Sequence, residues 1–199
     1  MKLRNRNITL WSVVLVIGMF AGCAKPPQNP AIQVDPGFQP ASIDLITMLP
    51  PIDARVDKSS KINLNTRLNK NARAELKKIG YASRIVESNG SESNINIEDL
   101  KAGDPEWIKQ LGPSDTNWVM ILVLGDVYSE ITFGSTGYAD VSGFLFDKRA
   151  GKRIWYDKGV AKVGAYGAVG LIGGKAVANN TALAVAVQDM IFSLPHRSK

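Results

Sequence analysis

A charge-free run of hydrophobic residues, several of them β-branched, extends from Trp118 to Leu124. Turn-forming residues 113–117 precede this run, and Gly125 and Asp126 follow it. The run is too short for a buried helix and has no polar position that could face water. It therefore predicts a central β-strand that is covered on both faces of its sheet.

Strand and helix patterns alternate before this central strand. Hydrophobic residues between Ile43 and Leu49 predict a first strand, which Pro50 and Pro51 end, and residues 52–65 are polar and predict a loop. From residue 66 the hydrophobic positions recur at helical spacing, at Leu68, Ala72, Leu76 and Ile79.

The ends of the helices carry recognisable capping residues. Asn65 is the expected amino-terminal cap of the first helix, and Gly80 is expected to follow its last turn with positive φ. A second strand is predicted at 81–87. Asp104 followed by Pro105 predicts the start of a second, short helix that ends near residue 112.

The carboxyl-terminal third predicts a hairpin and a closing helix. Residues 138–147 and 153–163 flank a compact turn at 148–152, and the hydrophobic positions of a helix follow at 176–194, with Leu183, Val187, Met190, Ile191 and Leu194 as the buried stripe. The fold class is therefore α/β, at the border of α+β. It is a single mixed sheet of about five strands in the order strand-helix-strand-helix-strand-strand-strand-helix.

The amino terminus has the pattern of a secretory signal peptide. Lys2, Arg4 and Arg6 precede an almost unbroken hydrophobic run over 8–21, which ends in Gly22 and Cys23. The run is short for a membrane-spanning helix, which needs about 20 hydrophobic residues. An ordinary signal peptide or an anchor helix with an incidental cysteine is the alternative interpretation.

Ala21-Gly22-Cys23 resembles the lipobox of bacterial lipoproteins, although Phe20 departs from the usual Leu, Val or Ile. The resemblance implies cleavage between Gly22 and Cys23 and acylation of Cys23 with lipids such as palmitate. Two or three acyl chains are enough for stable membrane anchoring. Because Ala24 is not acidic, the resemblance also implies the outer membrane and a domain on its periplasmic face, with the inner membrane or the cell surface left open.

The residues after the cysteine predict a tether. Half of the ten prolines in the chain lie between Ala24 and Ala41, where no hydrophobic periodicity is present. A first strand packed on the domain is the alternative. The predicted domains are a signal peptide at 1–22, the lipidated cysteine and tether at 23–41, a globular periplasmic domain at 42–195 and a tail at 196–199.

Charge and cysteine content restrict the partners. The net charge of the 199-residue chain is +6, and removal of Lys2, Arg4 and Arg6 leaves +3, which is weak evidence for a polyanionic ligand. The predicted compartment excludes nucleic acid, whereas anionic lipid headgroups remain open as a partner. Lipidation would use the single cysteine, so no disulfide is expected.

Candidate catalytic patterns are incomplete. Gly173-Gly174-Lys175 lacks two parts of a phosphate-binding loop, because Val169 stands where glycine is needed and Ala176 where serine or threonine is needed. Residues 164–174 are instead expected to be a loop, an interface or a membrane-contacting segment. Neither a bound cofactor nor a small-molecule substrate is expected.

The titratable residues do not form a recognisable active site either. Asp126 and Glu130 would lie about 13 Å apart along a strand. His196 is the only histidine, and lipidation would use Cys23, so these residues cannot form a structural zinc site or a Cys–His dyad. Neither an enzyme nor a metal site is therefore expected. A membrane-spanning hairpin over 138–163 is disfavoured because Asp157, Lys158 and Lys162 lie on its second strand.

The order of several short motifs resembles a family of small bacterial lipoproteins of unknown function. The motifs are Leu45–Pro51, Gly80-Tyr81, Leu111-Gly112, Asp147–Lys152 and Ile154-Trp155, and they cover most of the chain. The resemblance implies a domain similar to the amino-terminal domain of the Tol translocation protein, the lipoprotein activator of penicillin-binding proteins and the curli secretion lipoprotein. It implies no particular binding residues.

The sequence leads to three functional hypotheses. The first is a lipid-anchored, non-enzymatic component that binds other envelope proteins or lipoproteins in an outer-membrane assembly for transport, secretion or cell-wall biogenesis. The second is a self-oligomerising subunit of an outer-membrane secretion channel. The third and least favoured is an envelope hydrolase.

Overall fold

The computed structural model describes residues 32–58, 62–86, 95–131, 134–165 and 174–197. The strands in this part are β1 (Gln33–Val34), β2 (Ile46–Met48), β3 (Ile52–Asp53), β4 (Ser83–Ile85), β5 (Trp118–Ile131), β6 (Ser135–Asp147) and β7 (Lys152–Ala165). The helices are α2 (Lys70–Lys78), α3 (Ile97–Ala102), α4 (Pro105–Lys109) and α6 (Gly174–Phe192). A 3-10 turn, η2 (Pro40–Ser42), precedes β2, and a π-helical turn, η3 (Asn65–Asn69), leads into α2.

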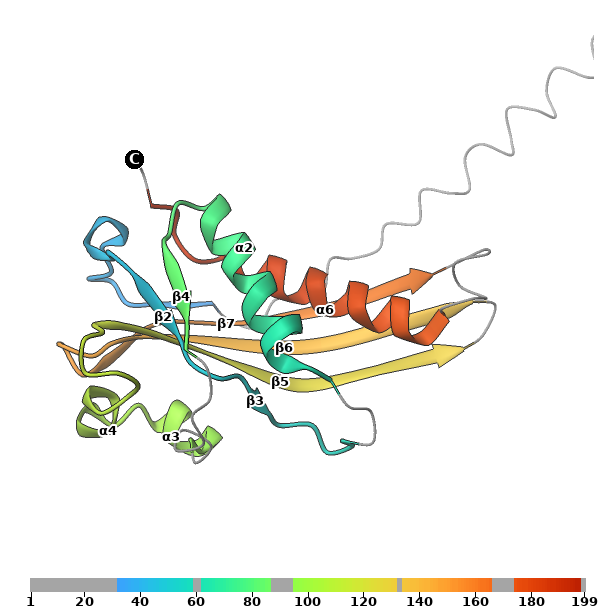
Figure 1. Cartoon of the computed structure of the whole chain (residues 1–199), viewed down its shortest axis with the longest axis horizontal. Coiled ribbons are helices and arrows are strands. Elements are labelled where there is room, and N and C mark those ends of the chain that lie inside the picture. The colour runs from blue at the N-terminus through green and yellow to red at the C-terminus, as the bar shows by residue number, and fades with distance from the viewer. Residues whose placement is uncertain (1–31, 59–61, 87–94, 132–133, 166–173, 198–199) are drawn as a thin grey trace, which may run out of the picture.

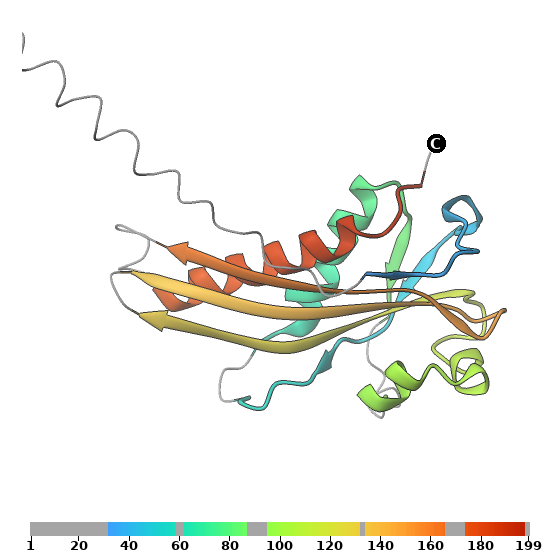
Figure 2. The ribbon, with the colours of Figure 1, turned by 180° about the vertical axis from the view of Figure 1, so that it is seen from behind.

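All seven strands of the described part belong to one mixed sheet, in the order β1-β7-β6-β5-β2-β4, with β3 also beside β5 (Figure 1). β5, β6 and β7 are antiparallel, whereas β2 and β3 run parallel to β5, and β2 is also parallel to β4. The predicted class, a mixed α/β sheet with helices packed against it, is confirmed. The three long strands extend beyond the others and give the molecule its elongated shape (Figures 1 and 2).

β5 is the central strand that its sequence predicts. Met120, Leu122 and Leu124 point to the face covered by α2 and α6, and they belong to the larger hydrophobic cluster. The residues between them, Val119, Ile121 and Val123, belong to a second cluster on the face of α3 and α4. Because both faces are covered over this part of β5, every position from Val119 to Leu124 is buried.

The closing helix α6 lies directly on β6 and β7 because three glycines leave room for it. A Cβ atom at Gly137 would overlap the backbone of Ala178, and one at Gly159 would overlap the carbonyl oxygen of Ala186. At Gly143 it would meet the Met190 sulfur at 2.8 Å. The expected buried stripe of α6 is confirmed, since Leu183, Val187, Met190, Ile191 and Leu194 are all buried.

The sheet has more strands than the predicted five; the sequence indicated one additional strand only as the alternative to the tether and did not indicate the other. β1 lies inside the predicted tether and pairs with β7, Gln33 opposite Tyr156 and Val34 opposite Trp155. β3 lies in a segment expected to be a loop and pairs with β5. Each has only two residues, too few for a period-2 pattern to be detected. The prediction that the tether extends to Ala41 is therefore corrected for its described part.

The ends of the helices agree with the predictions in two places and differ in one. Gly80 has φ +94° after α2, and the Asp104 carboxylate accepts a hydrogen bond from Trp107 N at 2.8 Å at the start of α4. Asn65, however, is part of η3 rather than a cap. The side chain that accepts from the backbone there belongs to Asn63, whose Oδ1 lies 3.0 Å from Thr66 N.

The remaining predicted boundaries shift slightly. The turn at 148–152 connects β6 and β7, and Gly151 has φ +61°. The second strand is shorter than expected, since β4 ends at Ile85, and α6 begins at Gly174 rather than at 176. α3, which the sequence did not predict, has only six residues and is capped by Asn96, whose side chain accepts a hydrogen bond from Glu98 N.

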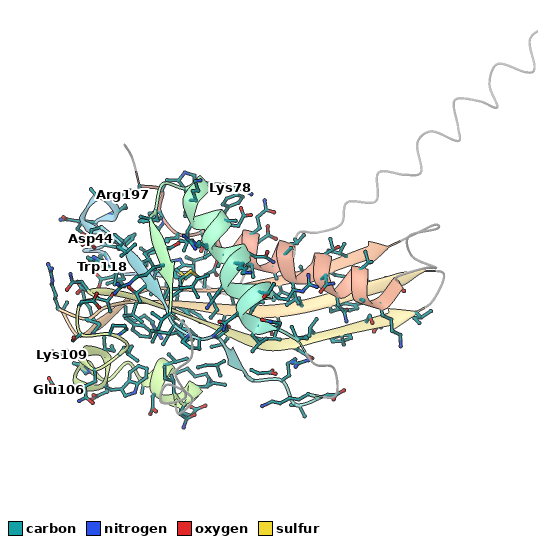
Figure 3. The ribbon with its side chains drawn as sticks, viewed as in Figure 1. Asp44, Lys78, Glu106, Lys109, Trp118 and Arg197 are labelled. Carbon is teal, nitrogen blue, oxygen red and sulfur yellow. The ribbon has the colours of Figure 1, made fainter. Side chains whose placement is uncertain are left out.

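The carboxyl-terminal residues are hydrogen-bonded to the residues that follow α2. Arg197 N donates to the Ile79 carbonyl at 3.0 Å, and the Tyr81 hydroxyl donates to the Pro195 carbonyl at 2.6 Å. Figure 3 shows Arg197 at the same corner of the molecule as Lys78, the last residue of α2. This segment thus closes the larger hydrophobic cluster at that corner, where Leu194 is fully buried.

Burial of Tyr81 predicts a loss of stability at alkaline pH. Its removal from water raises the pKa of Tyr81 from 10.0 to about 12. The neutral phenol is therefore favoured in the fold, and its contribution is complete below pH 10 and lost as the pH rises through about 12. We expect urea denaturation to show an alkaline loss of at most about 3 kcal/mol from this group. The loss should be absent from Tyr81→Phe, and an equal loss in that variant would contradict the assignment.

Candidate protein-interaction surface

The predicted lipidation site lies outside the described residues. Gly22 and Cys23, and with them the signal peptide and most of the tether, belong to residues 1–31. The modification of Cys23 therefore stays a prediction. Among the helices of the described segments, none combines the length and the hydrophobicity that a membrane span requires.

The other candidate residues are not brought together into a catalytic site. Gly173 lies outside the described residues, and Lys175 is exposed on the first turn of α6. His196 is exposed near the carboxyl end of the described chain. Within the described segments, no group of three His, Cys, Asp or Glu side chains is close enough to hold a metal ion.

Asp126 and Glu130 lie on the same face of β5, as the strand prediction implies, but each carboxylate has its own local partner. Asp126 Oδ1 accepts from Val127 N at 2.7 Å, and Glu130 Oε2 accepts from the Tyr138 hydroxyl at 3.2 Å. The two acids therefore belong to a wider surface instead of a carboxylate pair.

That surface is the uncovered face of the outer part of the three long strands. In Figure 2 the ends of β5, β6 and β7 lie in front of α6, and no helix of the described chain covers them from the viewer's side. We define the open face as the side chains that point this way, namely Asp126, Tyr128 and Glu130 of β5, Thr136, Tyr138, Asp140 and Ser142 of β6, and Lys158, Val160 and Lys162 of β7.

Alternating burial along β6 shows how the strand separates its two sides. Gly137, Ala139 and Val141 are buried under α6, whereas Tyr138, Asp140 and the other open-face residues between them are partly exposed. The regular period of two is what a strand produces when only one face of its sheet is covered.

A bulge at Gly125 places the side chains of β5 on the open face. The pairing of β5 with β6 shifts between Leu124 and Asp126. Before the shift, Leu124 faces α6; after it, Val127 does so and belongs to the same hydrophobic cluster. The extra residue inverts the alternation, so Tyr128 points to the open face. A Cβ atom at Gly125 would also come within 3.1 Å of the Asp140 carboxyl carbon.

Two tyrosines and a lysine form a row across the open face. The rings of Tyr128 and Tyr138 are stacked, with centroids 4.5 Å apart and planes 12° from parallel. Lys162 Nζ lies 4.9 Å from the centroid of the Tyr138 ring, which is within the range of a cation–π interaction. The row follows directly from the register, in which Tyr128 pairs with Tyr138 and Tyr138 pairs with Lys162.

The charges of the open face differ between its two sides. β5 carries Asp126 and Glu130, and β7 carries Lys158 and Lys162. Lys158 forms an ion pair with Asp140 on the strand between them. The interaction with the Tyr138 side chain raises the pKa of Lys162, and partial burial, followed by Tyr138 and Glu130, raises the pKa of Tyr128. These raised pKa values keep Lys162 cationic and Tyr128 neutral at neutral pH.

Both outer strands of this part of the sheet have free edges in the described chain. The partners of β5 beyond β6 are β2 and β3, which reach no further than Leu124. Beyond β6, β7 pairs with β1 at Trp155 and Tyr156. Backbone N–H and C=O groups at a free strand edge can pair with a strand of another chain.

A shallow cavity of about 320 Å³ lies elsewhere, between the start of η3 and the first turns of α6. Its lining combines amide, guanidinium and hydrophobic groups, namely Ile62, Asn63, Arg67, Ala176, Asn179, Asn180 and Leu183. The lining has no carboxylate, imidazole, hydroxyl or thiol group that could act as a general base or nucleophile. This cavity therefore does not suggest an enzymatic reaction.

The sequence indicates that several residues of the open face are exposed, but not that they lie side by side on one surface. The alternation of Asp126, Tyr128 and Glu130 predicts a half-exposed strand end. The stacked tyrosine pair depends on the register between β5 and β6. Counting back from the β5–β6 turn, where Ile131 pairs with Ser135, gives this register, but the sequence predicted the second strand only from Tyr138 onwards.

The sequence matches no protein-family model and no curated protein. Similar solved structures include the PelC dodecamer from Paraburkholderia phytofirmans, which is 10% identical, covers 80% of this chain and 96% of that chain, and has a TM-score of 0.47. Lipoprotein GNA1162 from Neisseria meningitidis is 21% identical, with coverages of 65% and 90% and a TM-score of 0.45.

The hypothetical protein CT253 from Chlamydia trachomatis is a third such structure, with 15% identity, coverages of 75% and 98% and a TM-score of 0.43. These likenesses are distant, with TM-scores below 0.5 in each case, so they carry no functional inference for this chain. The more specific resemblance to the Tol, penicillin-binding-protein activator and curli secretion proteins stays a prediction.

Proposed function

We propose that this chain is a lipid-anchored protein of the outer membrane that binds another envelope protein through its open face, without enzymatic activity. The lipobox-like Ala21-Gly22-Cys23 supports the anchor. The observation that carries the binding role is a sheet whose outer part is covered by a helix on one side only and whose edges are free in the described chain.

The chemistry of the open face suits a protein partner. Tyr128 is 45% exposed and is held in place by its stack on Tyr138, so it can be buried in an interface with little further loss of rotational freedom. Tyrosine is one of the residues enriched at interface centres, where it combines a large hydrophobic surface with a polar end. The surrounding acids and lysines supply the polar rim.

The same charges are poorly arranged for catalysis. Asp140 is paired with Lys158, and the Glu130 carboxylate accepts from Tyr138. A hydrolase needs an acid and a base, or a nucleophile next to a base, at a point where a substrate can lie between them. Asp140 and Glu130 instead each contact another side chain of the open face, which favours binding over bond breaking.

A photo-crosslinking residue at position 128 tests the binding role in intact cells. We expect benzoylphenylalanine in place of Tyr128 to capture a defined envelope protein or a second copy, because Tyr128 is exposed on the open face next to the free edge of β5. The matched control is the same residue in place of Glu106, which is on α4 at the opposite end of the molecule (Figure 3). Equal capture at both positions, or none at position 128, would contradict the proposal.

Self-assembly is the second candidate function, as a subunit of an outer-membrane secretion channel. The observation that favours it is that each free edge, of β5 and of β7, is open to a copy of the other. The size of the native particle after detergent extraction distinguishes the two functions. A large closed ring is expected of a channel, and a small particle of a binding component.

A further inference from the structure

The two sides of the open face are complementary to each other in charge. The free edge of β5 carries Glu130 and Asp126, the second of which also interacts electrostatically with Arg55 after β3, and the free edge of β7 carries Lys158 and Lys162. Because opposite charges lie at opposite edges of one sheet, the β7 side of one copy matches the β5 side of another. Such an arrangement favours head-to-tail contact between copies and disfavours contact between two identical edges.

Of the two stacked tyrosines, Tyr138 has two partners in the row, whereas Tyr128 has one. The Tyr138 ring has Tyr128 stacked on one side and the Lys162 ammonium 4.9 Å from its centroid on the other. Tyr128 has only the stacked partner among these contacts, and neither β2 nor β3 extends along β5 as far as Tyr128. A lysine placed there would repeat the contact that Lys162 makes with Tyr138.

The strand directions allow the sheet to continue. β5 and β7 are both antiparallel to β6, so they run in the same direction. A β7 strand from a second copy can therefore lie beside β5 in parallel, with both copies in the same orientation relative to the membrane.

We infer that the partner at the open face is a second copy of this chain, whose β7 edge pairs in parallel with β5 so that its Lys162 lies beside Tyr128. The inference rests on self-assembly, the second function proposed above, and names the contact between copies on the same surface. In this register Val160 of the second copy is opposite Asp126, and Gly164 of the second copy is opposite Glu130. The incoming ammonium lies between the two carboxylates, diagonal to each at about 7 Å between backbones.

The edge of β7 is available for this contact in the described chain. β1 pairs with Trp155 and Tyr156, and the contact requires the later residues of the strand, from Val160 onwards. The sequence before β1 contains Pro26, Pro27 and Pro30, which lack the N–H groups needed to continue a ladder along β7.

Charge reversal in mixed copies tests the inference. The full-length, processed protein is extracted in detergent, and its association is followed by sedimentation. We expect Glu130→Lys alone and Lys162→Glu alone each to raise the dissociation constant about tenfold or more, because like charges then meet at the edge. Mixing the two variants should restore association, since each carries the complement of the other.

Mixing distinguishes a contact between copies from a defect within one copy. Each variant still carries its own substitution in the mixture, so a defect within one copy would persist there. Glu106→Lys, an equal change of charge on α4, is the matched control and should associate like the unaltered chain. Failure of the mixture to recover, or unaltered chain that sediments as a single copy, would overturn the inference. In that event, capture of a different protein from position 128 would leave the proposed binding role standing, whereas no capture would overturn both.

Discussion

Gly159→Ala is expected to lower the free energy of unfolding by about 3 kcal/mol, at the upper end of the usual cost of overpacking. The added methyl group would overlap the carbonyl oxygen of Ala186 and would lie 3.1 Å from the Met190 Cβ. Since the obstacle includes the backbone of α6, no side-chain rotation can relieve it, and the helix must move away from the sheet. Urea denaturation of the detergent-solubilised chain measures the change.

Gly37→Ala is the matched control for this prediction. The nearest atoms to a Cβ at Gly37 belong to the flexible side chains of Asp35, at 3.1 Å, and Lys152, at 4.0 Å. We expect a change of less than about 0.5 kcal/mol there, as at most surface positions. If both variants unfold at the same urea concentration as the unaltered chain, α6 does not lie on β7 as closely as described.

Cys23→Ser is expected to abolish maturation of the protein. The lipobox resemblance assigns acylation to the sulfur of Cys23, and the hydroxyl of serine is a much weaker nucleophile than a thiolate. The variant should keep residues 1–22 and incorporate no fatty acid. Metabolic labelling with palmitate and the electrophoretic mobility of the chain measure both effects.

Ala24→Ser is the control, because it changes the neighbouring residue by the same hydroxyl group and leaves the cysteine in place. It should be acylated and cleaved like the unaltered chain. Normal cleavage of Cys23→Ser would contradict the lipoprotein assignment, since an ordinary signal peptidase would then be responsible.

The sequence predicted those parts of the fold where a long periodic pattern is present. The hydrophobic run around Leu122, the stripe of α6 around Val187 and the turn at Gly151 each specified an element that the structure confirms. In each case several positions indicate the same element, so the prediction does not depend on any one residue.

Elements that depend on distant partners could not be predicted in this way. β1 and β3 are defined by their pairing with β7 and β5, and two residues have no period of their own. The bulge at Gly125 is a second example. All residues from Val119 to Leu124 are buried, so this stretch gives no phase from which the inversion at Asp126 could be recognised.

The open face also depends on partners that are distant in the sequence. Its members were visible in the sequence as polar alternation, but the row of Tyr128, Tyr138 and Lys162 requires three strands to be placed side by side. The anchor is the opposite case. Cys23 is defined by adjacent residues alone, and the sequence remains the source of that prediction.

The intact mass of the native polypeptide tests the lipid anchor most directly. The protein is purified from its own membranes and its amino-terminal peptide is analysed by mass spectrometry. We predict a chain that begins at Cys23 and carries acyl groups on that residue. An amino terminus at Met1, or an unmodified thiol at Cys23, would contradict the account of a membrane-tethered domain that meets its partners at the bilayer surface.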